Sequence, residues 1–391
     1  MKFFRFSMFF AAFGLLMAAC QPDADLITPA QTDAVQVRST SNQPNYVFVM
    51  TNAPEGNEVV SYRQGADGSL AEVASLATGG DGGNLTGSSI DPLAAQDHLI
   101  VDGQRRKLFV ANPGSNTVSM INVLGNGGLK LADVVPSGGS FPVSLATDGK
   151  RLFIVNAADG GSVQGYAIQG NKLTALGNLP QVGANAGDIE ISPDGNSLLV
   201  TERASGDIVV VPITAGGSFG SPTRVASPTP TPFGTDIRSD GILLVSEANA
   251  PGGPPAVANG STVSSFRIAA DGTLSLVSGA VATNQTAACW VELNDAGTYA
   301  YSSNTPSGTL SSFAVAPDGS LTLLESVAGA SGGPGILDTE TTGDYLYGIV
   351  AGLESIVVFR INGDGSLTGL PALNVSDDRF VSGFFTGIAG F

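Results

Sequence analysis

The chain has 391 residues, 34 of them acidic and 17 basic, and its formal net charge at pH 7 is −17. An acidic surface repels phosphate groups, so nucleic acids are excluded as partners, whereas small molecules, carbohydrates and proteins are not. Because Cys20 belongs to the leader described next, Cys289 has no partner for an intrachain disulfide bond, and we expect its thiol to be buried.

Residues 1–19 have the features of an export signal, because Lys2 and Arg5 precede a short apolar stretch that ends in small residues. The sequence LMAAC resembles a bacterial lipobox, in which the cysteine becomes the lipidated first residue of the mature protein. This resemblance implies an exported protein that Cys20 anchors in the cell envelope, with membrane contact only through the lipid. An ordinary cleaved signal is the alternative. Residues 20–44 are polar and predict a flexible tether, and residues 45–391 form the folded domain.

Seven similar units follow one another from residue 45 onward. Each has a strong strand signal: NYVFVMTN, KLFVAN, RLFIVN, SLLVTE, ILLVSE, TYAYSSN and DYLYGIV. A second strand follows each time, then a tight turn such as GADGSL, APDGSL or GDGSL, then a third strand, a loop and a further strand. Asp-Gly turns between alternating apolar runs are typical of β-hairpins. Four strands in each of seven units predict an all-β fold, a seven-bladed β-propeller with four-stranded antiparallel blades.

The first unit begins at its second strand, near Tyr46, and lacks an innermost strand. The C-terminal sequence GFFTGIAGF is left over and can supply it. We therefore predict that the N-terminal and C-terminal strands pair in one blade and close the ring of a monomer.

The order of the strands separates two faces of the predicted ring. The short turns, which join the first strand to the second and the third to the fourth, lie on one face. The long insertions lie on the opposite face, at residues 78–96, 228–232, 249–261 and 329–335. Because rigid scaffolds carry binding sites on variable loops, we expect the functional site on this loop-bearing face.

Polar residues alternate with apolar ones along the innermost strands, so the polar set is expected to face the central channel. Alignment on the glycine that ends each strand places these residues at one level: His98, Ser144, Glu190, Asp236, Glu292 and Asp338. Arg238 and Glu340 are expected at the next level. A ring of carboxylates suits Ca²⁺ or Mg²⁺, with Glu190, Asp236, Glu292 and Asp338 as ligands, whereas a water-filled channel without a metal is the alternative. Trp290 is expected in the core or at the channel mouth.

A second polar set ends the second strand of six units: Asn52, Asn112, Asn156, Glu202, Glu247 and Asn304. Asparagine at this position usually caps the following turn. A carboxylate has little advantage as a cap, so Glu202 and Glu247 are candidate catalytic groups that activate water. Arg203, or a bound cation, is the candidate group for polarising a carbonyl.

The units SPDGNSLLVTERASGDIVVV and NDAGTYAYSSNTPSGTLSSFAVAPDGSLTLL resemble the seven-bladed lactonase family, which includes 6-phosphogluconolactonase-like and carboxymuconate-cyclase-like proteins. PTPFGTD and TNQTAACWVEL are similar to its exported branch. The resemblance spans residues 45–391 and implies opening or closing of lactone rings at the loop-bearing mouth. Glu202 matches the glutamate that the family carries at the end of a second strand. The family's Arg-His pair is missing from the preceding GANAGDIEISPDG.

Two functions therefore remain open. The first is a lipid-anchored hydrolase of a small neutral lactone, in which Glu202 or Glu247 activates water. The second is a non-catalytic propeller that binds a glycan, a peptide or an envelope protein through its loops.

Overall fold

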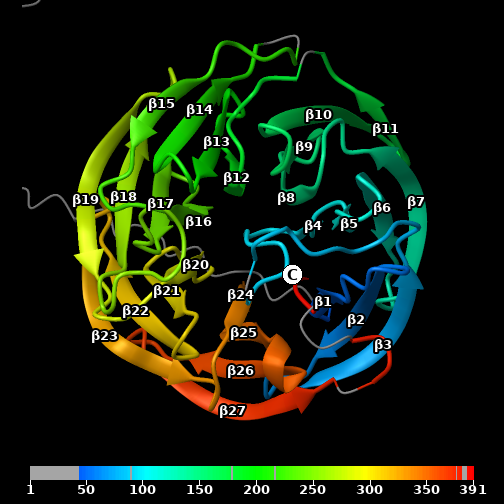
Figure 1. Ribbon diagram of the computed structural model, residues 1–391. Helices are drawn as coiled ribbons and strands as arrows, with labels where there is room; N and C mark the ends of the chain where they lie inside the picture. Colours follow the sequence, from blue (N-terminus) through cyan, green and yellow to red (C-terminus); the bar gives the residue numbers. More distant parts are fainter. Residues whose placement is uncertain (1–43, 89, 178, 215–216, 376, 381–384) are drawn as a thin grey trace, which may run out of the picture. The chain divides into compact units, whose positions relative to one another are not determined.

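The computed structural model describes residues 44–88, 90–177, 179–214, 217–375, 377–380 and 385–391. Within these residues the chain forms 28 strands in seven four-stranded antiparallel sheets, which are arranged as blades around a central axis (Figure 1). The predicted signal, Cys20 and almost all of the predicted tether lie outside the described residues. The described part contains one short 3-10 helix, η1 (Ala351–Leu353), and no helix in it is long and apolar enough to cross a membrane.

The strands fill the blades in chain order. The first three blades contain β1 (Tyr46–Met50), β2 (Glu58–Gln64) and β3 (Leu70–Ala77); β4 (Leu99–Asp102), β5 (Lys107–Asn112), β6 (Thr117–Val123) and β7 (Leu129–Pro136); and β8 (Pro142–Thr147), β9 (Arg151–Asn156), β10 (Ser162–Gln169) and β11 (Lys172–Ala175). The fourth and fifth contain β12 (Ala186–Ile191), β13 (Ser197–Glu202), β14 (Asp207–Pro212) and β15 (Thr223–Ala226); and β16 (Pro232–Ile237), β17 (Ile242–Glu247), β18 (Thr262–Ile268) and β19 (Leu274–Ala282). The last two contain β20 (Ala288–Leu293), β21 (Tyr299–Asn304), β22 (Thr309–Val315) and β23 (Leu321–Ala330); and β24 (Ile336–Thr342), β25 (Tyr345–Val350), β26 (Ser355–Ile361) and β27 (Leu367–Asn374).

The ring is closed by the two ends of the folded domain, which confirms the prediction. The last strand, β28 (Ile388–Gly390), pairs antiparallel with β1 as the innermost strand of the first blade. Beyond this pairing, the Tyr46 backbone N–H donates to the Phe391 carbonyl at 2.9 Å, and the Phe391 N–H donates to the Tyr46 carbonyl at 3.1 Å. The predicted all-β, seven-bladed architecture is therefore also confirmed.

The position of a strand in its blade determines how much of it is buried. Every residue of the second strands β13 and β17 is buried, because each lies in the middle of a blade with neighbouring blades on both sides. The outermost strand β23 has exposed residues along most of its length. Apolar β-branched and aromatic side chains fill the second strands because both faces of those strands pack against other blades.

The repeated Asp-Gly-Ser turns pack one blade against the next. In one turn, Asp67 Oδ1 accepts hydrogen bonds from the backbone and the hydroxyl of Ser69 at 3.1 and 2.6 Å, which fixes the turn. Gly68 has a φ of +82°, and a Cβ atom there would lie 2.5 Å from the Tyr345 ring of the adjacent blade. Only glycine permits this close approach. The Tyr347 hydroxyl of the adjacent blade donates a hydrogen bond to the Gly68 carbonyl at 3.0 Å. The corresponding glycines of three other turns, Gly127, Gly319 and Gly365, lie against Tyr46, Ile242 and Tyr299.

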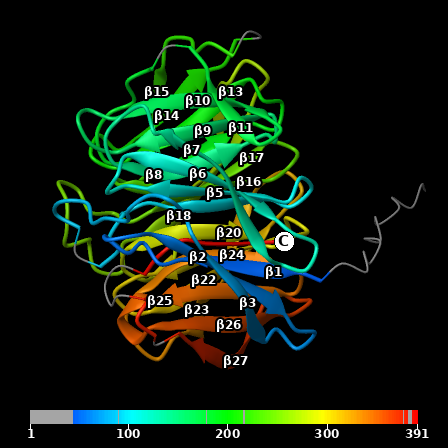
Figure 2. The same ribbon diagram turned by 90° about the vertical axis from the view of Figure 1, so that its right-hand side faces the viewer.

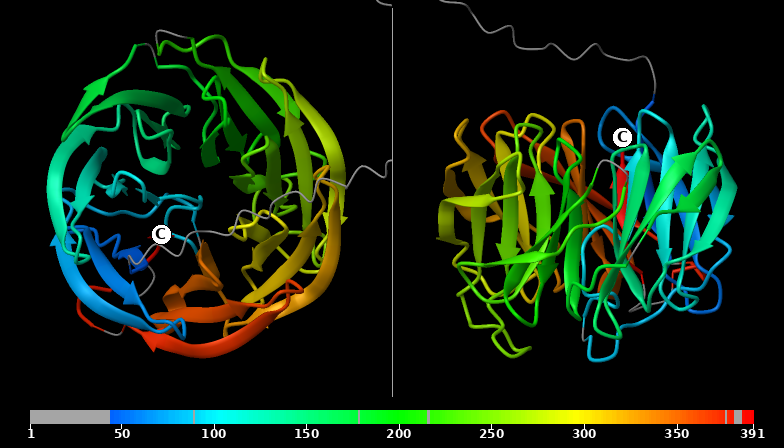
Figure 3. Two further views of the ribbon diagram at one scale, coloured as in Figure 1. Left: turned by 180° about the vertical axis from the view of Figure 1, so that it is seen from behind. Right: turned by 90° about the horizontal axis from the view of Figure 1, so that it is seen from above.

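The connections between strands emerge on two opposite faces, as the side views show (Figure 2, Figure 3). The Asp-Gly turns lie on one face, which we call the turn face. The long connections between β3 and β4 and between β17 and β18 lie on the other, which is the loop-bearing face.

Candidate functional site

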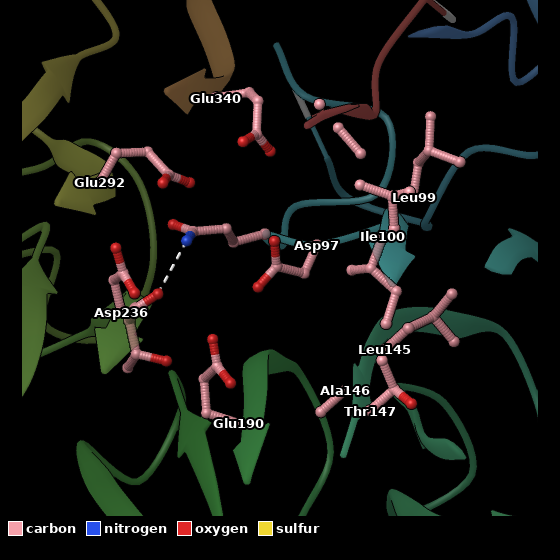
Figure 4. A pocket seen from close by; sticks show the side chains of 15 residues that line it. Asp97, Leu99, Ile100, Leu145, Ala146, Thr147, Glu190, Asp236, Glu292 and Glu340 are labelled. Atoms are coloured by element: carbon pink, nitrogen blue, oxygen red, sulfur yellow. Dashed lines mark hydrogen bonds between the residues drawn. The ribbon is translucent and has the colours of Figure 1, made fainter. Parts of the chain in front are cut away.

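Four carboxyl groups project into the central channel from consecutive blades. Each pairs with the third residue of its neighbouring strand, so they lie at one level: Glu190 with Leu199, Asp236 with Leu244, Glu292 with Tyr301, and Glu340 with Tyr347. Figure 4 shows their side chains converging on the axis from β12, β16, β20 and β24. The channel therefore has a continuous acidic wall over four of the seven blades.

The prediction that His98, Ser144 and Asp338 share this level is wrong. Ile100 pairs with Phe109, Ala146 with Phe153, and Glu340 with Tyr347, so the three predicted residues lie two positions earlier in their strands. The cause is a difference in turn length. In the last blade, the turn between the paired residues Thr342 and Tyr345 consists of residues 343–344. In the fourth blade, the turn between the paired residues Ile191 and Leu198 consists of residues 192–197. Because the turn glycine stands at different distances from the strand ends, alignment on it shifts some blades by two residues.

The opposite half of the channel wall is mainly apolar, and the two halves enclose a cavity of about 260 Å³, which we call the axial cavity. Its described lining residues are Gln96, Asp97, Leu99, Ile100, Val101, Leu145, Ala146, Thr147, Glu190, Thr235, Asp236, Glu292, Glu340, Ala389 and Gly390. This lining set includes five carboxyl groups but no lysine, arginine or histidine. Such a cavity repels anions and accepts molecules that are uncharged or positively charged.

The carboxyl groups of the axial cavity hold protons more tightly than ordinary carboxyl groups do. Burial raises the pKa of Asp236 to about 6. The pKa values of Glu190, Glu292 and Glu340 lie well above the usual range, first because of burial and second because neighbouring carboxylates repel a further negative charge. The pKa of Asp97 is raised for the same two reasons. Carboxyl groups with raised and unequal pKa values can serve together as carboxylate acceptors and as carboxylic acid donors.

Residues 91–97 of the long loop between β3 and β4 cross the channel, as Figure 1 shows, and we call them the plug. The Gln96 backbone N–H donates to the Gly187 carbonyl at 2.9 Å, and its side-chain Nε2 donates to the Thr235 carbonyl at 2.8 Å. From a third blade, Trp290 Nε1 donates to the Ala95 carbonyl at 2.9 Å. The plug is thus bonded to strands on the far side of the ring.

The plug changes where the site lies. The cavity lining runs from Gln96 in the plug to Thr147, the last residue of β8. Because β8 ends at the turn face, the cavity extends from the plug toward that face and away from the long loops. The expectation of a channel site at the loop-bearing mouth therefore does not match the position of this cavity.

His98 and Trp290, both predicted channel residues, are buried beside the plug and are absent from the lining of the cavity. His98 Nδ1 bonds the Val143 carbonyl, and Nε2 lies 4.0 Å from Asp91 Oδ1 without a hydrogen-bond partner. Burial lowers the pKa of His98. The Trp290 ring is 1% exposed and packs edge-on against Phe233, with 5.2 Å between ring centroids. Of its two predicted locations, Trp290 occupies the core.

Asp338 belongs to the closure of the ring. Its Oδ2 accepts a hydrogen bond from the backbone N–H of Ile388 in β28 at 3.2 Å. A second buried carboxylate, Asp188, accepts hydrogen bonds from Ser144 Oγ at 2.7 Å and from Thr235 Oγ1 at 2.6 Å. These two carboxylates therefore join neighbouring blades.

Glu202 and Arg203 lie at the end of β13 and outside the axial cavity. The Glu202 carboxylate accepts the backbone N–H groups of Ala204 at 3.1 Å and Ser205 at 2.7 Å. It is a turn cap, so the expectation that a carboxylate has little capping advantage here is wrong. Arg203 Nε donates to the Asn185 carbonyl at 3.1 Å, and its guanidinium carbon lies 5.5 Å from the centre of the Phe233 ring.

Glu247 is fully buried and surrounded by hydroxyl groups. Its Oε1 accepts from Ser227 Oγ at 2.6 Å and from the Thr229 backbone N–H at 3.2 Å, and Thr262 donates to Oε2. Burial raises the pKa of this carboxyl group. Glu247 therefore has no exposed surface, and both of its carboxylate oxygens accept hydrogen bonds from the protein.

The predicted metal ligands are not assembled as a metal site. Asp338 points to β28, away from Glu190, Asp236 and Glu292. Among the described residues, no three His, Cys, Asp or Glu side chains are placed so that they could hold a metal ion.

Sequence reasoning missed the two plug residues that line the cavity, Gln96 and Asp97. Asp97 has a φ of +58°, so the alternation of strand β4 does not extend back to it. The only available signal was the polar triplet Gln96-Asp97-His98 immediately before an apolar run. That signal does not say which of the three side chains faces the axis.

The fold is similar to solved structures of lactonase-like propellers. A candidate 6-phosphogluconolactonase of Bacteroides uniformis matches with a TM-score of 0.68 and 16% identity, over 90% of this chain and 100% of that chain. The periplasmic gluconolactonase of Pseudomonas aeruginosa matches with a TM-score of 0.66 and 17% identity, over 89% of this chain and 99% of that chain. At these identities the likeness shows a shared fold. None of the curated proteins matches the chain.

The sequence itself matches the family described as "Lactonase, 7-bladed beta-propeller" over residues 137–239 and 248–375, which is more than half of the chain. The chain belongs to the lactonase family of seven-bladed β-propellers.

Proposed function

We propose that this lactonase-family propeller hydrolyses a small uncharged lactone in the axial cavity. The observation that carries the proposal is a cavity lined by five carboxyl groups and by no basic side chain among its described lining residues. A phosphorylated lactone would be repelled by such a wall, whereas the hydroxyl groups of a neutral sugar lactone would find acceptors and donors. The apolar half of the wall suits the ring carbons of such a molecule.

The reaction needs a base, an acid and one water molecule. Ionised Asp236 takes a proton from the water as the water oxygen attacks the lactone carbonyl carbon. Protonated Glu292 donates a hydrogen bond to the carbonyl oxygen as negative charge develops there. The ester C–O bond then breaks, and the ring oxygen leaves as an alcohol with the proton held by Asp236. The product hydroxy acid ionises, and repulsion from the acidic wall favours its release.

The relative from Pseudomonas aeruginosa is named a periplasmic gluconolactonase. A neutral sugar lactone agrees with the charge of the axial cavity, and an envelope location agrees with the leader of this chain. We include export and lipidation of Cys20 in the proposal. Metabolic labelling with a fatty acid tests it: the label should enter the wild-type protein and be absent from Cys20→Ser.

Activity is tested by proton release from neutral and phosphorylated lactones, using purified residues 38–391 with Mg²⁺, with Ca²⁺ and with a chelator. We expect turnover of a neutral lactone, and a loss of about 100-fold or more in kcat for Asp236→Asn and Glu292→Gln. Glu202→Gln is the matched control, because this carboxylate lies outside the cavity. Loss of activity in Glu202→Gln with normal activity in the other two would place the reaction at the loop-bearing face instead.

The non-catalytic alternative has one supporting observation. Ile90, Val257 and Leu353 are 46%, 48% and 47% exposed on connections of the loop-bearing face. If no lactone in the panel is turned over above background, the lactonase proposal fails for that panel. A search for a glycan, a peptide or an envelope protein that binds this face would then be the next experiment.

A further inference from the structure

Gln96 links the plug to the two strands that carry Asp236 and Glu292. Its Nε2 donates to the Thr235 carbonyl at 2.8 Å and to the Val291 carbonyl at 3.2 Å, and its Oε1 accepts the Val291 backbone N–H at 3.1 Å. Thr235 and Val291 immediately precede Asp236 and Glu292 in the chain. The side chain is 1% exposed and uses both ends of its amide.

Both strands are irregular where Gln96 binds. The pairing of β16 with β17 shifts between Pro232 and Thr235, and that of β20 with β21 shifts between Ala288 and Val291. Next to these shifts, the Thr235 carbonyl and both backbone groups of Val291 make hydrogen bonds with the Gln96 amide. The amide of Gln96 satisfies them, which avoids leaving buried backbone groups unpaired.

The neighbouring glycine provides the space for this amide. A Cβ atom at Gly234 would lie 2.0 Å from Gln96 Oε1 and 2.9 Å from the Cys289 carbonyl oxygen. Any side chain at this position would displace Gln96 from its place between β16 and β20. The sequence of β16 is thus compatible with Gln96 only because residue 234 is glycine.

A second bond between the same strands reaches the cavity directly. The Leu293 backbone N–H of β20 donates to Asp236 Oδ2 at 2.7 Å, so the direction of the Asp236 carboxyl group depends on the separation of β16 and β20. Gln96 holds that separation on the plug side of the cavity. The titratable groups that surround Asp236 are Asp188 and Glu190 of β12, Glu292 of β20, Glu340 of β24 and Asp97 of the plug.

We propose that Gln96 is a positioning residue, which sets the spacing of Asp236 and Glu292 so that one acts as the base and the other as the acid. This inference rests on the proposed function. Gln96 does not exchange a proton with the substrate; it acts by fixing two strands. A loss of the amide lets the strands separate and water enter, and both changes weaken the burial and the repulsion that raise the pKa values of these two carboxyl groups.

The test compares Gln96→Ala, which removes the amide, with Gly234→Ala, which displaces it. The matched control is Gln164→Ala, because Gln164 is a buried glutamine whose amide bonds Gly165 and Leu176, away from the cavity. We expect both cavity variants to lose about tenfold or more in kcat with little change in KM, since a small misplacement of reacting groups has effects of this size. The acidic limb of the pH–rate profile should move to lower pH in both variants and stay in place in Gln164→Ala.

A second readout does not depend on activity. Carboxyl ¹³C NMR titration of the folded proteins should show the apparent pKa of the Asp236–Glu292 pair lower in Gln96→Ala and Gly234→Ala than in wild type. Unchanged titration in variants that merely unfold more easily would overturn the inference and leave Gln96 a structural residue. If wild type turns over no lactone, the proposed function fails, and the titration alone still decides whether Gln96 controls the pair.

Discussion

Glu247 and Ser264 lie on neighbouring strands of one blade, and the Ser264 hydroxyl is within 3.0 and 2.9 Å of the two carboxylate oxygens of Glu247. Asn304 occupies the equivalent position in the next blade, at the end of its second strand, β21. There, Asn304 Nδ2 donates to Ser311 Oγ at 3.0 Å and to Thr309 Oγ1 at 3.2 Å. Glu247 therefore takes part in a pattern of cross-strand hydrogen bonds that asparagine also makes. At this structural position, a carboxylate takes the place of the asparagine amide.

Glu247→Gln should be tolerated and should stabilise the protein at neutral pH. Burial raises the pKa of Glu247 in the folded state, so its favourable contribution is complete below the unfolded pKa and is lost as pH rises through the folded pKa. Glutamine stays neutral, and its amide can donate to the hydroxyl groups as Asn304 does. We expect a gain of about 1 kcal/mol in the free energy of unfolding at pH 7.5 and a smaller gain at pH 5, measured in urea. The exposed Glu325→Gln is the control; a Glu247→Gln protein less stable at both pH values contradicts the interpretation.

The acidic cavity predicts that stability falls as pH rises. The folded-state pKa of Asp236 is raised to about 6, so its contribution is present below the unfolded pKa and disappears as pH passes through about 6. A shift of this size corresponds to a loss of about 1.4 kcal/mol between pH 5 and pH 7.5. Asp236→Asn should reduce this slope in urea denaturation series, whereas the exposed Asp378→Asn should not. A wild-type slope of opposite sign would show that other groups dominate.

Cys289 should be inert in the native protein. Its thiol is buried, as the sequence analysis predicted, and burial raises its pKa to about 12. The thiolate that reacts with thiol reagents is therefore almost absent at pH 8. Residues 38–391 should react with an aromatic disulfide reagent only after unfolding, whereas an exposed Ser307→Cys should add one fast-reacting group to the folded protein. Rapid labelling of native wild type would contradict the burial of this residue.

Phe391 should contribute measurably to the closure of the ring. Its ring centroid lies 6.1 Å from that of Tyr46 and 5.8 Å from that of Phe48, and the guanidinium carbon of Arg106 lies 5.1 Å from it. Phe391→Ala removes these contacts from a partly buried site and should lower the free energy of unfolding by about 2 kcal/mol. The control is Leu124→Ala, a 45% exposed side chain whose loss should change stability by less than about 0.5 kcal/mol. Equal effects of the two variants would argue against a role in closure.

The architecture was predictable because its signals are local. Strand patterns and Asp-Gly turns recur in every unit, and Gly68 shows why: the turn needs a positive φ and close contact with the next blade. The level of each channel residue was less predictable, because it depends on the lengths of the inner turns. His98, Ser144 and Asp338 were misplaced for this reason, whereas Glu190, Asp236 and Glu292 lie together on the acidic wall.

The plug was beyond the reach of sequence patterns. Gln96 bonds backbone groups of Val291, which is 195 residues away and lies beside a shift in strand pairing. A hydrogen bond to a backbone group does not depend on the residue type, so no motif or spacing in the sequence indicates this contact. The surroundings of Glu202 and Glu247 were unpredictable for a similar reason, because their hydrogen bonds come from backbone N–H groups and hydroxyl groups of adjoining turns and strands.

The pairing of β28 with β1 has a consequence for synthesis of the protein. The first blade to leave the ribosome contains three consecutive strands, and its fourth strand, Ile388–Gly390, is made only after the other six blades. Until those residues emerge, the inner edge of β1 has unpaired backbone groups that chaperones can recognise. Residues 388–390 must therefore be made before the ring can close, so a nascent chain stays incompletely folded until they emerge.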